Sequence, residues 1–139
     1  MNKYYSLSFN EFVFLYPDFE GAVILHDINE ELDTENIYIC FIKNQQYHRE
    51  EGPAVIHSGG TLEWYQNGKM HREDGPALIM FNGIEIWRQH GEIHREDGPA
   101  IVFPMDAKMN EWWIHDKELS EQEHKVWQRS RKLKEFLDD

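Results

Sequence analysis

A tandem repeat with a period of 23 residues constrains the fold of this chain more than any other feature of its sequence. Residues 48–54 read HREEGPA, and HREDGPA returns at residues 71–77 and 94–100. Six of the seven residues are identical in all three copies. Between the copies, WYQNGK at residues 64–69 matches WRQHGE at residues 87–92, and degenerate copies of this second segment lie at residues 41–46 and 112–117. Repeats of this length stack as supersecondary units, because one unit alone cannot bury its apolar face.

Each repeat has the pattern of a β-hairpin. Residues 53–57 form a β-prone run that opens with Pro, which a strand tolerates at its first position. Residues 58–60 predict a turn and residues 61–66 a second strand, which alternates apolar and polar side chains. Asn67-Gly68 predicts a type I′ turn, because both residues accept a positive φ. A single hairpin is only marginally stable in water, so we expect consecutive hairpins to form an antiparallel meander.

The segment before the repeats predicts a short helix and two strands. Residues 8–11 form a capping box, which four apolar residues at helical spacing accompany: Phe9, Phe12, Val13 and Tyr16. We expect a helix that ends before Pro17, although a strand over residues 12–16 fits the pattern nearly as well. Residues 22–26 and 37–42 predict strands on either side of an acidic loop.

The segment after the repeats predicts a longer helix. Residues 120–123 form a second capping box, and the helical pattern continues to about Leu137. One stripe of this helix is apolar and contains Val126, Leu133 and Leu137. An uncovered sheet edge invites aggregation, so we expect this helix to cap the open end of the hairpin stack. The alternatives are a helix that lies on a membrane surface or one that docks a partner.

The sequence therefore predicts a mainly β fold: an antiparallel meander of hairpin repeats with a short N-terminal helix and a C-terminal capping helix. We expect one domain over the 139 residues, since chains of this length form about one domain. Its predicted parts are an N-terminal lead-in over 1–40, the hairpin repeats over 41–119 and the C-terminal helix over 120–139.

The charge of the chain narrows the class of partner. Its 14 basic and 26 acidic side chains give a formal charge of −12, and residues 1–119 carry all of this excess. An acidic field repels nucleic-acid phosphates, so we expect no direct contact with DNA or RNA. The same field accelerates encounter with a basic protein, and the simpler alternative is that it serves solubility alone.

Other features exclude whole classes of protein. The longest uncharged apolar run near the start, residues 12–16, is too short for a membrane span or a signal peptide, so we expect a cytoplasmic protein. The single cysteine, Cys40, excludes an intrachain disulfide and a cysteine zinc cage, and its apolar neighbours predict a buried, inert thiol. The chain has no phosphate loop, nucleophile elbow or zinc-protease motif, so we expect neither enzymatic activity nor a cofactor.

Residues 64–71, WYQNGKMH, carry a resemblance to a known family. They resemble the MORN repeat, which has the same period, pairs an aromatic residue with Asn-Gly-Lys-x-His and forms consecutive hairpins. After the histidine this chain departs from that family and is similar to variant HREDGPA repeats of uncharacterised phage and bacterial proteins. The resemblance covers residues 41–119 and implies a binding or scaffolding surface rather than a catalytic site.

The repeated basic residues are the first candidates for a site. His48, His71 and His94 recur once per repeat, so equivalent rings lie roughly 10 Å apart, too far to share one metal ion. We expect these rings to satisfy turns or to stack beside tryptophans, and we expect no metal site. The arginines that follow them are Arg49, Arg72 and Arg95. We expect these to pair with Glu50, Glu73 and Glu96 of adjacent repeats; alternatively, the histidines and arginines together bind a small anionic ligand such as a nucleotide signal.

The aromatic and acidic residues are candidates for partner binding. Trp64, Trp87 and Trp112 occupy equivalent places, with Tyr65 beside the first of them. Core packing is one prediction for them, and an exposed interface is the other. The acidic loop adds further candidates: Asp27, Glu30, Glu31 and Asp33.

These observations predict a non-enzymatic, acidic protein-binding module. The predicted role is an inhibitor that acts by direct contact with a protein partner, of the phage anti-defence or bacterial immunity type. Self-association through an open sheet edge stays an open alternative, since unpaired edge strands accept other chains.

Overall fold

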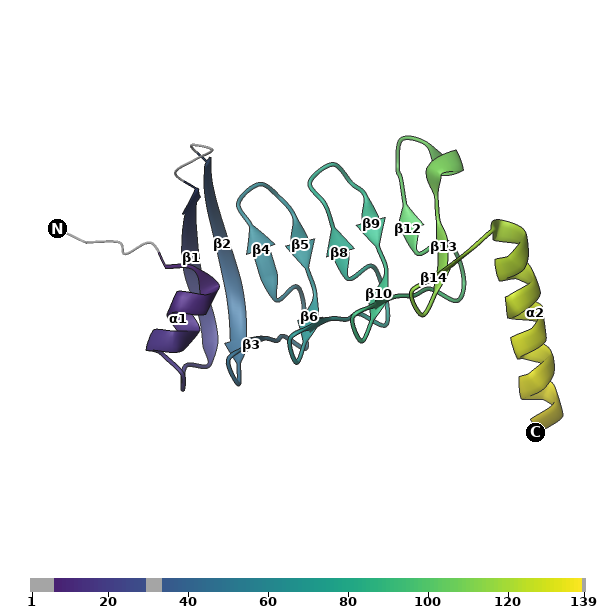
Figure 1. Ribbon diagram of the computed structural model, residues 1–139, viewed down its shortest axis with the longest axis horizontal. Coiled ribbons are helices and arrows are strands. Elements are labelled where there is room, and N and C mark those ends of the chain that lie inside the picture. The colour runs from purple at the N-terminus through teal and green to yellow at the C-terminus, as the bar shows by residue number, and fades with distance from the viewer. Residues whose placement is uncertain (1–6, 30–33, 139) are drawn as a thin grey trace. The chain divides into compact units, whose positions relative to one another are not determined.

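The computed structural model describes residues 7–29 and 34–138, which fall into two compact units, Met1–Met70 and His71–Asp139. Within each unit the strands form antiparallel hairpins (Figure 1). Among the described residues, each unit also contains one α-helix. The predicted mainly β meander with an N-terminal and a C-terminal helix is therefore confirmed. The boundary between the units falls directly before the second HREDGPA copy.

The first unit begins with α1 (Phe9–Leu15), whose N-cap is Ser8. Glu11 accepts hydrogen bonds from the backbone and hydroxyl of Ser8, so the predicted capping box is present. The helix ends before Pro17, as predicted, because Pro cannot continue it. Phe12 of α1 packs on the sheet against five buried residues: Leu25, Tyr38, Cys40, Ile42 and Val55.

The sheet of the first unit is built from β1 (Gly21–Asn29), β2 (Thr34–Lys43), β4 (Val55–His57) and β5 (Leu62–Glu63), each antiparallel to the next. β3 (Gln46–Tyr47) pairs with the end of β2, and β6 (Tyr65–Gln66) with β7 (Lys69–Met70). The first two strands are longer than predicted. Asp27 and Glu35 therefore lie on strands rather than in a loop, whereas Glu30, Glu31 and Asp33 lie outside the described residues. Cys40 is fully buried, and burial raises its pKa to about 12, in agreement with an inert thiol.

The second unit repeats this plan. β8 (Leu78–Ile79), β9 (Glu85–Ile86) and β12 (Ile101–Val102) form an antiparallel sheet, and β10 (Arg88–Gln89) pairs with β11 (Glu92–Ile93). A 3₁₀ turn (Ala107–Met109) precedes the hairpin of β13 (Trp112–Ile114) and β14 (Lys117–Leu119). After a capping box at Ser120, α2 runs over Glu121–Asp138 and packs against that hairpin.

Each repeat contains two short hairpins rather than the one predicted. The second strand is interrupted at Trp64 and at Trp87, where the chain changes its pairing partner. Before Trp87, strand β9 pairs with β12 across the sheet. The backbone N–H of Trp87 donates to the carbonyl of Ala100. After Trp87, strand β10 pairs with β11, which begins three residues further along the chain. The small hairpins close through two consecutive residues with positive φ, as in Asn67-Gly68 and His90-Gly91. This is the predicted type I′ geometry.

Candidate functional site

Each HREDGPA copy folds into a compact turn; residues 48–54, 71–77 and 94–100 are the first, second and third turns. Arg95 shows how the arginine is held in the third turn. Its Nη1 donates to the carbonyl of Pro99 at 3.1 Å, its Nε donates to Asp97 at 2.7 Å, and its guanidinium lies 3.8 Å from the ring centre of Trp87. The guanidinium thus interacts with a carbonyl, a carboxylate and an aromatic ring of the protein itself.

The arginines of the other turns are held in the same way. Arg72 donates to the carbonyl of Pro76 at 3.3 Å and to Asp74 at 2.9 Å. Arg49 donates to the carbonyl of Pro53 at 3.1 Å and lies 3.8 Å from the ring centre of Phe41, which occupies the place of the tryptophan. The bond from the arginine to the proline carbonyl, which with its neighbouring contacts we call the arginine clamp, therefore recurs in all three copies of the motif.

The guanidinium of the arginine lies directly against the glycine of the same motif, where a side chain would meet it. A Cβ added at Gly75 would stand 2.6 Å from Cζ of Arg72, and one added at Gly98 would stand 3.2 Å from Cζ of Arg95. Only a residue without a side chain leaves room for the guanidinium at this distance.

In the second and third turns the arginines pair with an aspartate of their own turn, where Arg–Glu pairs with adjacent repeats are expected. This aspartate lies two residues after the arginine. The glutamates instead face the histidines of their own turns, with Nε2 of His71 3.8 Å from Glu73 and Nε2 of His94 3.4 Å from Glu96. The reason is local: the arginine side chain folds over the glycine of its own turn, which brings its donors to the aspartate and the proline carbonyl.

The histidines tie each turn to the small hairpin that follows it. Nδ1 of His71 accepts the backbone N–H of His90 at 3.0 Å, and Nδ1 of His94 accepts that of His115 at 3.3 Å. His48 accepts from the backbone of Asn67 in the same way, at 3.1 Å. In every case the donor is the first positive-φ residue of the type I′ turn. The prediction that these rings satisfy turns is confirmed.

This role requires a neutral imidazole with Nδ1 unprotonated. His71 and His94 are almost completely buried, and burial lowers the pKa of both rings below the ordinary value of 6.5. His71 and His94 are therefore uncharged structural acceptors at neutral pH. Among residues 7–29 and 34–138, no cluster of histidine, cysteine and acidic side chains could hold a metal ion.

The acidic side chains of the turns point outward. The side chains of Glu50, Glu73, Asp74 and Asp97 are 78–86% exposed, whereas those of Arg72 and Arg95 are 21–25% exposed. Hydrogen bonds from Arg72 and Arg95 lower the pKa of Asp74 and Asp97, so these carboxylates stay ionised at neutral pH. The turns thus present anionic groups to solvent and keep their cationic groups in the fold.

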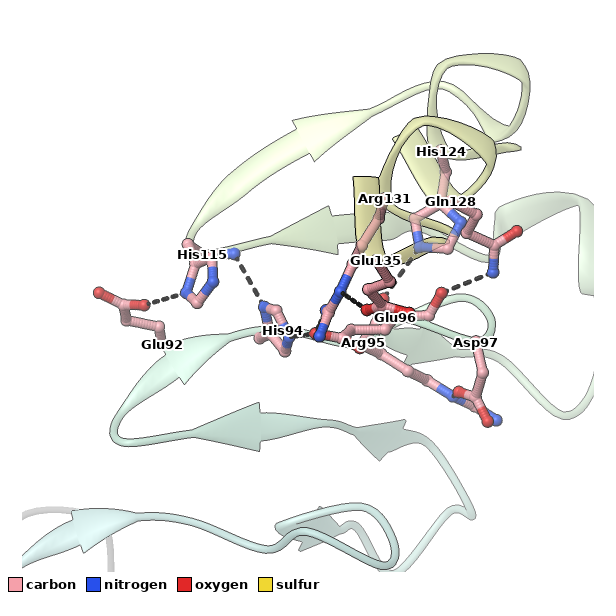
Figure 2. Close-up of polar contacts among 10 residues, drawn as sticks. All are labelled: Glu92, His94, Arg95, Glu96, Asp97, His115, His124, Gln128, Arg131 and Glu135. Atoms are coloured by element: carbon pink, nitrogen blue, oxygen red, sulfur yellow. Dashed lines mark hydrogen bonds and ion pairs between the residues drawn. The ribbon is translucent and has the colours of Figure 1, made fainter. Parts of the chain in front are cut away.

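The third turn is covered by α2 (Figure 2). Nε2 of His124 donates to the carbonyl of Arg95 at 2.9 Å, and Nε2 of Gln128 donates to the carbonyl of Glu96 at 2.5 Å. Arg131 pairs with the carboxylate of Glu96. The helix lies against the last repeat as expected, but the expected apolar stripe does not make the contact. A polar stripe does, because the carbonyls of the turn need donors.

His124, Gln128 and the two aspartates were not singled out from the sequence. The only signal for the first two is that His124, Gln128 and Arg131 recur at i, i+4 and i+7, which places them on one face of a helix.

The other predicted site residues lie in several environments. Trp64, Trp87 and Trp112 are half-buried where the strands meet the small hairpins, and Trp87 is the platform for Arg95. Tyr65 packs against the core of the first unit. Asp27 lies on β1 opposite Asn36 of β2, and it precedes the first turn by a long stretch of sequence.

Comparison with known proteins identifies no relative. No protein-family model matches the chain, and neither a curated protein nor a solved structure is significantly similar to it. No helix among the described residues is both long enough and apolar enough to cross a bilayer.

Proposed function

We propose that this chain is a non-enzymatic protein-binding module that contacts a basic protein partner through the outward carboxylates of its HREDG turns. One observation carries the proposal: the arginine and histidine of each turn are bonded into the fold, while the side chains of Glu50, Glu73, Asp74 and Asp97 are 78–86% exposed. The MORN-like pattern of the repeats supports the same class, since such arrays serve as contact surfaces. An inhibitor of the phage anti-defence or bacterial immunity type is the role that fits a small acidic chain of this kind.

The charge of the whole chain supports a basic partner. With a formal charge of −12, the protein attracts cationic surfaces over about one Debye length, roughly 8 Å at physiological salt. Steering of this kind raises association rates and weakens as salt is added. We therefore expect binding that is strongest at low ionic strength.

The arginine clamps weigh against the alternative of a small anionic ligand. A nucleotide would need the guanidinium forks of Arg49, Arg72 and Arg95, whose donors already serve carbonyl groups of their own turns. Binding would cost the turn its hydrogen bonds. We expect calorimetry with a panel of nucleotides to give no heat of binding, and a measurable affinity that is lost in Arg72→Lys would favour the alternative.

Affinity capture from bacterial lysate with two matched variants tests the proposal. The turn variant carries Glu50→Gln, Glu51→Gln and Glu73→Gln, which leave every arginine clamp intact. The control variant carries Asp18→Asn, Glu20→Gln and Glu118→Gln, three exposed acids outside the turns. Both variants change the net charge by the same amount.

We expect a protein that the wild type and the control retain at low salt and that the turn variant loses. The affinity for that protein, measured by calorimetry, should fall about tenfold or more in the turn variant. Equal losses in the two variants would mean that only net charge matters, and no loss in either would reject the turns as the contact surface.

A further inference from the structure

Helix α2 leaves an apolar stripe in solvent. Val126, Leu133, Phe136 and Leu137 are 50–78% exposed. At 3.6 residues per turn, Val126, Leu133 and Leu137 lie on the side of the helix opposite His124, Gln128 and Arg131, which contact the third turn. The docked face is thus polar and the free face is apolar, the reverse of an ordinary packed surface helix.

Basic side chains surround this stripe. Residues 125–134 contain five basic and no acidic side chains. Arg129 and Lys132 lie on one side of the stripe and Lys134 on the other, by the same helical spacing. Over residues 125–134 the free face of α2 is therefore apolar at its centre and cationic at its margins.

A second unpartnered apolar surface lies in the first unit. Helix α1 packs on one face of β1 and β2 (Figure 1). On the opposite face, which we call the outer face, Ile24 is paired with Ile39, Ile39 with Ile56 and Ile56 with Leu62, so that one row of aliphatic side chains crosses four strands. Ile24 is 68% exposed and Ile39 38%, and Ile37 beside them is 42% exposed.

The two surfaces are similar in length and belong to segments of opposite net charge. Residues 1–47, which contain β1 and β2, have two basic and eight acidic side chains, a net charge of −6. The stripe from Val126 to Leu137 is about 16 Å long at 1.5 Å per residue. The row across four strands measures about 14 Å at the usual strand spacing. One helix is therefore long enough to cover the row.

We propose that α2 of one copy of this chain docks on the outer face of the first unit of a second copy. This head-to-tail contact buries both apolar surfaces and places the cationic margins of α2 beside the acidic N-terminal segment. The contact is heterologous, so each added copy exposes a new docking site and the assembly grows with concentration. The inference uses other residues than the proposed function and does not depend on it.

The charges favour this occupant over two others. Pairing α2 with α2 of a second copy would bring together two segments that each carry five basic side chains and no acidic ones. An anionic membrane would attract the helix but repel a chain of formal charge −12. The acidic unit of another copy supplies both the apolar surface and the opposite charge.

Sedimentation velocity of the full chain over a wide concentration range tests the proposal with three variants. Ile24→Glu places a charge in the outer face, Leu133→Glu places one in the stripe, and Met105→Glu is a control at a residue that is 93% exposed outside both surfaces. We expect wild type and Met105→Glu to assemble beyond dimers. Either of the other variants alone should raise the concentration needed by about tenfold or more.

Mixing the two variants gives the decisive result. The Ile24→Glu chain retains its helix stripe and the Leu133→Glu chain retains its outer face, so an equimolar mixture should form dimers that grow no further. A wild type that is monomeric at every concentration would overturn the proposal. So would assembly that Leu133→Glu abolishes and Ile24→Glu leaves unchanged, which would indicate α2–α2 pairing.

Two further measurements separate folding and membrane effects. Far-UV circular dichroism and thermal unfolding establish that each variant is folded. If either does not fold, Arg129→Glu with Lys132→Glu replaces it, and we expect this change to weaken assembly at low salt. Vesicles of phosphatidylserine and phosphatidylcholine should not retain the protein on sedimentation, and retention by a monomeric wild type would overturn the proposal in favour of a membrane.

Discussion

The second and third turns have the same seven residues but different surroundings. In both, the arginine bonds to a proline carbonyl and an aspartate, and the histidine accepts from the following small hairpin. Only the third turn is covered by α2, and its Glu96 side chain is 43% exposed where Glu73 of the second is 84% exposed. The inward bonds are thus the same with and without the helix, which adds contacts to the carbonyls of Arg95 and Glu96 and to the Glu96 carboxylate.

This difference separates what the motif does by itself from what a neighbour adds. The histidine, arginine, aspartate and glycine form one closed set of contacts inside the motif and its next hairpin. The helix contacts groups outside this set, which are the backbone carbonyls of Arg95 and Glu96 and the carboxylate of Glu96. Removing the inward contacts should therefore destabilise both turns, and removing the outward ones only the third.

The largest effect should come from the buried histidines. Replacing His94 or His71 by Ala leaves a cavity and an unpaired backbone N–H at His115 or His90. We expect each change to lower the free energy of unfolding by about 2–4 kcal/mol, measured by urea denaturation. His94→Asn and His71→Asn are the controls, because the Asn oxygen can accept the same N–H. Equal losses in the Ala and Asn variants would show that volume and not the hydrogen bond matters.

Removing the contacts of α2 should have a smaller effect that is confined to the third turn. The double change His124→Ala with Gln128→Ala deletes the donors to the carbonyls of Arg95 and Glu96. We expect a loss of about 1–3 kcal/mol in the free energy of unfolding. Amide hydrogen exchange should become faster in residues 94–100 and stay unchanged in residues 71–77. Faster exchange in both segments would contradict the independence of the inward contacts.

The glycines allow the two arginine clamps to be compared directly. The Cβ of Ala at position 75 would come within 2.6 Å of Arg72, and that at position 98 within 3.2 Å of Arg95. Gly75→Ala should therefore displace its guanidinium and cost about 1–2 kcal/mol, and Gly98→Ala less than about 1 kcal/mol. Thermal unfolding of both variants measures this order. Arg72→Ala with Gly75→Ala should cost little more than Arg72→Ala alone, because the clash is then absent.

The repeat predicted the architecture, and it could not predict how side chains are shared within the turn. Spacing located the hairpins, both capping boxes and the histidines that satisfy turns. Spacing also suggested Arg–Glu pairs between repeats. The arginine clamp instead depends on the guanidinium folding over Gly75 or Gly98, and the spacing of residues in the sequence does not show this fold. For a similar reason, the sequence pattern did not show which face of the C-terminal helix contacts the last repeat. An apolar stripe at Val126, Leu133 and Leu137 normally indicates the buried face, and here backbone carbonyls of the third turn select the polar face instead.

The smallest effect concerns the pKa values of the two histidines. Burial lowers the pKa of His71 and His94, so each contributes stability that is complete above pH 6.5 and is lost as the pH falls toward the folded-state value. Arg131 of α2 also lowers the pKa of His94, after burial and His115, and nothing equivalent acts on His71 from the helix. NMR titration of the ring protons should therefore show Arg131→Gln raising the pKa of His94 alone. A parallel shift at His71 would mean that the helix acts on both turns through the protein's overall field, and the two turns would then differ less than their contacts indicate.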